Sequence, residues 1–161
     1  MIRLEKEEKV AVLGIGNEFR GDDAAGLLVA RKLAPLSGER VLVLEGGCSP
    51  ENFTGALRRF SPSLVLMIDC LDFGGKPGGI HLLDASKIRG STFSTHNPSL
   101  ALLAEYLKRE LGTKVLLIGI QPKQLSGAPS GEVLHAVDKV ASLLEGALRI
   151  LETSFPHGPS T

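Results

Sequence analysis

The sequence lacks three features that would assign it to a special class of protein. Its two cysteines, Cys48 and Cys70, are too few for a disulfide framework and fit a reducing cytosol. Eighteen basic and eighteen acidic residues cancel, which argues against an electrostatic hold on nucleic acid or anionic lipid. No apolar run approaches the ~20 residues of a membrane span, and the charged N-terminus lacks the apolar stretch of a signal peptide. We therefore expect a cytoplasmic protein that binds no nucleic acid and inserts into no membrane.

The composition is that of one globular domain. The chain has 161 residues, of which 43% are hydrophobic and 22% charged, values that exclude disorder and fibrous structure. A chain of this length buries a core without disulfides or a structural metal. We expect residues 1–152 to form a single domain, and residues 153–161, which contain two prolines and no periodicity, to be a frayed tail.

Short apolar runs alternate with helical patterns along the chain. A helix is expected from the Ser49 cap and Pro50, a second after Asn97-Pro98, and a third over 133–151, where apolar residues form one stripe. This alternation predicts an α/β domain with a mostly parallel sheet covered on both faces, a three-layer α/β/α architecture. The candidate strands are 10–15, 41–44, 64–68 and 115–118, with a shorter one at 79–84.

Polar residues follow several of these strands, at the sheet edge where such folds bind ligands. Asp22 and Asp23 follow the first strand, and an acidic helix start accounts for only one of the two. Asp69 directly follows five apolar strand residues, where an unpaired carboxylate is costly to bury. His96 follows the fourth strand. Together Asp23, Asp69 and His96 form a donor set suited to a divalent transition metal, although their spacing alone is a weak signal.

Two other functions are compatible with parts of the same pattern. The glycine-rich loop after the first strand and Glu45 after the second are typical of a small nucleotide- or cofactor-binding domain, but Phe19 occupies the third glycine position. Paired acids are typical of a receiver-like signalling domain, but Asp22 lies several residues beyond the strand. In addition, Gln121, and not a lysine, ends the last strand. Both alternatives fit poorly.

Three other residues have simpler interpretations. Cys48 and Cys70 are predicted to be small core residues, because lone thiols most often are. Gly26 is predicted to allow close helix packing. A serine or cysteine nucleophile is not indicated, since no G-x-S-x-G elbow is present.

Five segments occur in this order: GIGN…GDDAAG (14–26), GGCSPEN (46–52), LMID (66–69), STHN (94–97) and GIQP (119–122). Together they resemble the hydrogenase maturation endopeptidases, which trim the large subunit of nickel–iron hydrogenases. No single motif is strong, but the joint order is specific, and the resemblance covers residues 10–152. The formate-hydrogenlyase-type (group 4) branch is most similar, because it shares the Asp-Asp pair, the THN triplet and the GIQP turn.

The resemblance implies a fold and a site. The fold would be a mixed five-stranded, phosphorylase/hydrolase-like sheet of strand order 2-1-3-5-4, with strand 4 antiparallel and helices on both faces. The family's metal-binding and catalytic residues would fall on Asp23, Asp69 and His96.

The resemblance also implies a reaction and a partner. A monomer would make one cut that removes a C-terminal peptide from the large-subunit precursor of a nickel–iron hydrogenase. Nickel would be supplied by that substrate and be absent from the resting enzyme. The hydrolytic step stays open: nickel polarises the scissile carbonyl or activates a water, or Asp69 or Asp23 acts as a general base.

Overall fold

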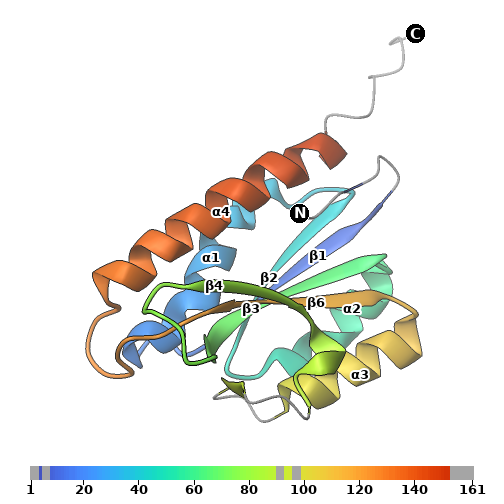
Figure 1. Ribbon diagram of the computed structural model, residues 1–161. Coiled ribbons are helices and arrows are strands. Elements are labelled where there is room, and N and C mark those ends of the chain that lie inside the picture. The colour runs from blue at the N-terminus through green and yellow to red at the C-terminus, as the bar shows by residue number, and fades with distance from the viewer. Residues whose placement is uncertain (1–3, 5–7, 90–92, 96–98, 153–161) are drawn as a thin grey trace, which may run out of the picture.

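The computed structural model, which describes residues 4, 8–89, 93–95 and 99–152, has one sheet between two layers of helices (Figure 1). The strands are β1 (Val10–Ile15), β2 (Val41–Gly47), β3 (Leu64–Asp72), β4 (Ile80–Asp84), β5 (Ser94–Thr95) and β6 (Lys114–Ile120). The helices are α1 (Ala25–Leu33), α2 (Thr54–Phe60), α3 (Leu100–Leu111) and α4 (Gly131–Glu152). Short 3₁₀ turns are η1 (Gly21–Ala24), η2 (Ala34–Leu36), η3 (Pro50–Phe53) and η4 (Ala85–Lys87).

The sheet confirms the predicted topology. Its order is β2-β1-β3-β6-β4, which is 2-1-3-5-4 when the five longer strands are numbered along the chain. β1, β2, β3 and β6 run parallel, and β4 is antiparallel to β6. The two-residue strand β5 was not expected from the sequence, and it pairs antiparallel with the end of β3.

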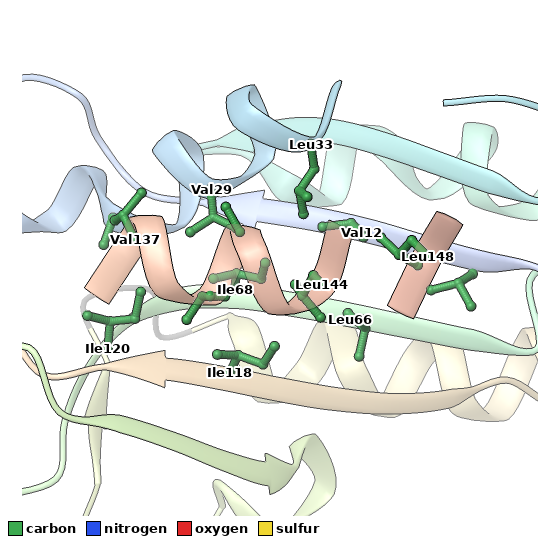
Figure 2. Close-up of a cluster of buried hydrophobic side chains, with 14 of the residues drawn as sticks. Val12, Val29, Leu33, Leu66, Ile68, Ile118, Ile120, Val137, Leu144 and Leu148 are labelled. Carbon is green, nitrogen blue, oxygen red and sulfur yellow. The ribbon is translucent and has the colours of Figure 1, made fainter. Parts of the chain in front are cut away.

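Two cores lie on the two faces of the sheet, because alternate residues of each buried strand point to opposite faces. On one face Val12 and Leu66 pack against α1 and α4 (Figure 2). On the other, Leu13 and Met67 pack against α2 and α3. The stripe predicted for α4 is confirmed: its buried residues are Val133, Ala136, Val137, Val140, Ala141, Leu144, Leu148 and Leu151.

Several element boundaries differ from the sequence prediction, among them the end of β2, which runs to Gly47 and not to residue 44. β3 continues through Asp69 to Asp72, because Asp69 and Cys70 still pair with the backbone of Gly119 and Ile120 in β6. After β2 the chain forms the turn η3 before α2 begins, and Ser49 makes no side-chain cap bond.

Two predictions about secondary structure fall on residues that the structure does not describe. The helix start at Asn97-Pro98 and the tail 153–161 lie outside the described residues. No helix among the described residues is long and apolar enough to cross a membrane.

Helix α1 packs directly onto the end of β1 and the middle of β3 through Gly26. A Cβ atom at this position would lie 1.9 Å from the carbonyl oxygen of Ile68 and 2.4 Å from that of Ile15. Real Cβ atoms do not approach backbone oxygens so closely, so glycine alone fits. The predicted role of Gly26 in close packing is confirmed, and the contact sets the position of η1, which precedes α1.

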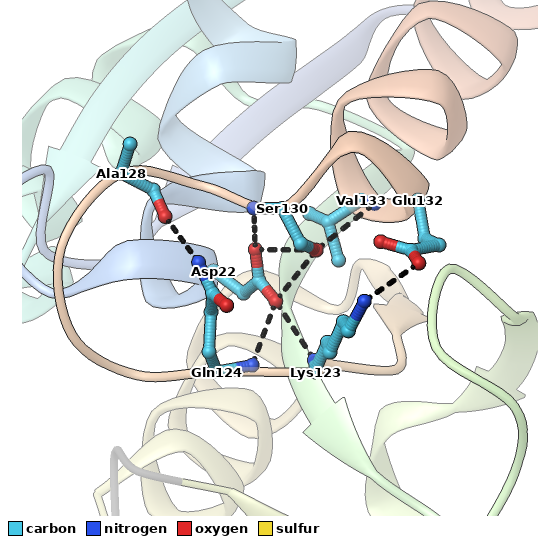
Figure 3. Close-up of polar contacts among 7 residues, drawn as sticks. All are labelled: Asp22, Lys123, Gln124, Ala128, Ser130, Glu132 and Val133. Carbon is cyan, nitrogen blue, oxygen red and sulfur yellow. Dashed lines mark hydrogen bonds and ion pairs between the residues drawn. The ribbon is translucent and has the colours of Figure 1, made fainter.

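Asp22, in η1, ties this region to the loop between β6 and α4 (Figure 3). Its fully buried carboxylate accepts backbone hydrogen bonds from Lys123 (2.7 Å), Gln124 (3.0 Å) and Ser130 (2.6 Å). The Ser130 hydroxyl donates as well, at 2.9 Å to both oxygens. Burial alone would raise the pKa of Asp22, but these hydrogen bonds outweigh it and lower the pKa below its ordinary value. Asp22 is therefore a structural carboxylate.

We predict that Gly26→Ala lowers the free energy of unfolding by about 1–3 kcal/mol, because the methyl group must push α1 off the sheet. Gly146, exposed in α4 with open space around its Cβ position, provides the control. Gly146→Ala should raise the free energy of unfolding by about 0.5–1 kcal/mol, since alanine is the better helix former. Urea denaturation measures both. Equal effects of the two substitutions would contradict the close packing.

We predict that Asp22→Asn lowers the free energy of unfolding by about 2–4 kcal/mol at pH 7, because an amide nitrogen cannot accept the loop N–H bonds. The folded-state pKa of Asp22 is lowered, so its contribution is complete above the unfolded value near 3.8 and is lost as pH falls through the folded value. The difference between wild type and variant should therefore shrink in acid. Asp138→Asn, at an exposed carboxylate in α4, should change little in urea denaturation. A difference that persists unchanged in strong acid would contradict the tether.

Candidate functional site

The candidate site lies at the carboxyl edge of the sheet between β1 and β3, where the strand order reverses. Asp23 reaches this edge from η1, and Asp69 from the second half of β3. Both side chains are buried, with 6% of Asp23 and 2% of Asp69 exposed. Such carboxylates need partners or a cation to compensate for lost water.

The loop after β1 positions Asp23. Gly16 has a φ of +144°, and a Cβ atom there would lie 1.9 Å from the Asp23 carbonyl oxygen, so the loop folds back tightly at this glycine. The Asn17 backbone N–H donates to the Asp23 carboxylate and to its carbonyl oxygen, each at 3.2 Å. Asp23 is thus fixed at the end of β1.

Asp69 is positioned by the sheet itself. Its backbone pairs with Gly119 of β6, and its carboxylate accepts a hydrogen bond from the Cys70 N–H at 2.8 Å. Pairing on both sides of β3 gives this carboxylate a rigid base, because β1 and β6 flank the strand. The residue predicted as a strand-end acid is therefore an acid within a strand.

The carboxylates at this edge of the sheet affect the pKa of the Cys70 thiol. Burial raises its pKa far above the ordinary value, and the negative charges of Asp69, Asp23 and Asp22, in that order, raise it further. Cys70 is buried, as predicted, and its thiol stays protonated at neutral pH. A neutral thiol is a poor nucleophile. Asp69 and Asp23 therefore both lie close enough to the Cys70 thiol for their charges to act on it.

The interpretation of Cys48 as a core residue is wrong. Its side chain is exposed, and its sulfur lies 3.7 Å from the Gly16 carbonyl oxygen. Gly47, at the end of β2, has a φ of +57°, so the chain turns sharply there. Cys48 follows that turn beside the loop after β1, and not in the core.

His96 lies outside the described residues. The residue before it, Thr95, pairs with Leu71, two positions beyond Asp69 in β3. Among the described residues, which leave His96 out, no group of three or more His, Cys, Asp or Glu side chains could hold a metal ion. The described part of the site is therefore a pair of carboxylates.

Gln121 and Glu45 have structural roles that the sequence did not reveal. The Gln121 side-chain oxygen accepts from the N–H groups of Phe73 (2.9 Å) and Gly75 (3.1 Å), which holds the loop between β3 and β4. Glu45, the acid of the dinucleotide alternative, forms an ion pair with Arg31 at 2.8 Å. Both roles depend on polar partners that lie far away in the sequence, so no local motif could have revealed these roles.

Comparison with known proteins places these features in one family. Residues 28–147 match the HycI family, described as hydrogenase maturation protease. The hydrogenase 3 maturation protease of Escherichia coli K12 is 38% identical over 138 residues, which cover 84% of this chain and 88% of that protein.

Solved structures agree with this match. The crystal structure of a [NiFe] hydrogenase maturation protease HycI from Thermococcus kodakarensis has a TM-score of 0.81 at 36% identity, covering 91% of this chain and 94% of its own. The solution structure of an endopeptidase HycI from Escherichia coli has a TM-score of 0.75 at 33% identity, covering 86% and 90%. The resemblance seen in the sequence is confirmed: the chain belongs to the hydrogenase maturation protease family, whose members are peptidases.

Proposed function

We propose that this chain removes the C-terminal peptide from the nickel-loaded large-subunit precursor of a nickel–iron hydrogenase of the group 4 type. One observation carries the proposal: in a chain of this family, Asp23 and Asp69 are two buried carboxylates at the β1/β3 switch point. The Asp-Asp pair and the similarity to a hydrogenase 3 maturation protease support the group 4 assignment.

The electrostatics of the site favour a cation carried by the substrate. Two buried carboxylates near each other repel, and a divalent ion between them relieves that repulsion. With His96 they offer three donors, which are too few to complete a nickel shell. Substrate thiolates supply the remaining donors. Nickel is then part of the substrate, and the protease distinguishes the loaded precursor from the metal-free one by binding this ion.

Two hydrolytic routes are compatible with this arrangement. Nickel can polarise the scissile carbonyl or lower the pKa of a water. Alternatively, Asp23 or Asp69 takes the proton of an attacking water as a general base. Cys70 is not the nucleophile in either route, because the raised pKa keeps its thiol protonated. The protease acts as a monomer in the cytoplasm, where its two free cysteines stay reduced.

We predict that Asp23→Asn, Asp69→Asn and His96→Ala each lower the cleavage rate of nickel-loaded precursor by about 100-fold or more, because each removes a donor or base. The fold should survive, since the asparagine variants keep the side-chain shape. Mass spectrometry of the precursor measures the rate, and thermal denaturation checks the fold.

Asp138→Asn provides the matched control, because it removes the same charge from an exposed ion pair with Lys32. It should cleave at the wild-type rate. If Asp23→Asn or Asp69→Asn also cleaved at the wild-type rate, that carboxylate would have no part in the reaction.

A further inference from the structure

Phe19 is an apolar side chain held out in solvent. It lies in the loop between β1 and η1, with 83% of its surface exposed. Among the large hydrophobic side chains that the structure describes, none is more exposed, and Leu143 in α4 follows at 66%. An isolated exposed apolar residue needs no explanation by itself, so the case for Phe19 depends on how its loop is built.

The loop holds Phe19 in a fixed position. Its backbone N–H donates to the Asn17 side-chain oxygen at 2.9 Å, and the Arg20 N–H donates to the Asn17 carbonyl oxygen at 3.2 Å. The neighbouring Glu18 forms an ion pair with Arg31 of α1 at 2.7 Å. The Gly21 N–H bonds the Gly127 carbonyl oxygen at 3.1 Å. The loop is therefore ordered before any partner binds, which reduces the entropy lost on binding.

The same loop holds the candidate catalytic acid. Asn17 donates its backbone N–H to Asp23 and accepts the N–H of Phe19 through its side chain. One residue thus links the protruding ring to the buried carboxylate. A partner that contacts Phe19 is therefore held at a fixed position relative to Asp23.

We infer that Phe19 is a docking residue for the hydrogenase precursor, and this rests on the proposed function. The protruding Phe19 ring can be buried only by a partner that has a recess for it. A folded protein surface can supply such a recess, whereas a small molecule is itself bound in a concave site of its receptor. Aromatic anchors ringed by polar groups dominate protein interfaces. Here Glu18 and Arg20, the neighbours of Phe19 in the chain, are charged and exposed. The precursor therefore presents an apolar recess next to its nickel.

The test measures initial cleavage rates of nickel-loaded precursor as a function of precursor concentration. Phe19→Ala should raise KM by about tenfold or more, the effect of losing one interface anchor. The kcat should stay within about twofold, because the ring does not touch the reacting atoms. Phe19→Leu, which keeps an apolar anchor, should recover most of the loss. Leu143→Ala removes a comparably exposed side chain on α4 and should leave both constants unchanged.

Each outcome decides the inference. A KM for Phe19→Ala within twofold of wild type would overturn it, as would a fall in kcat at unchanged KM. An equal rise in KM for Leu143→Ala would show a general loss of apolar surface, which also overturns it. Failure of the wild-type chain to cleave loaded precursor would show that the proposed function is wrong, and the docking role falls with it.

Discussion

The close approach of α1 to β1 and β3 is the constraint on which the rest of the site depends. At Gly26 the helix backbone lies against the carbonyl oxygens of Ile15 and Ile68, with no room for a side chain. Because η1 leads directly into this helix, the contact places Asp22 and Asp23 at the point where the strand order reverses. In the first motif, Gly16 allows the loop to fold back onto Asp23, and Gly26 allows the helix to approach the strands.

The adjacent residues Asp22 and Asp23 have different roles at this edge of the sheet. Asp22 uses both carboxylate oxygens to hold the β6–α4 loop through Lys123, Gln124 and Ser130. Asp23 accepts from Asn17 within its own loop, and its charge acts together with that of Asp69 on the Cys70 thiol. Asp22 thus stabilises the backbone around Asp23, which is the carboxylate proposed to react. A single acid could not fill both roles, because the hydrogen bonds of the tether occupy both oxygens.

The sequence predicted what local patterns encode, and it missed what distant partners decide. Buried parallel strands and the stripe of α4 follow from apolar periodicity, and both are confirmed. The length of β3 was missed because Asp69 ends the apolar run, while backbone pairing with β6 continues. The role of Asp22 was missed because its partners lie more than 100 positions away along the chain. Cys48 carries no periodic signal, and its exposure follows from the turn at Gly47.

The central claim is that the carboxylate pair recognises a metal carried by the substrate. The most direct measurement compares cleavage of metal-free and nickel-loaded large-subunit precursor by the same purified chain. The account predicts that the metal-free precursor stays uncut, that the loaded precursor is cut, and that free nickel does not make the protease active on casein. Equal cleavage of both precursors, with Asp23 and Asp69 still required, would contradict it and would indicate an ordinary hydrolytic site.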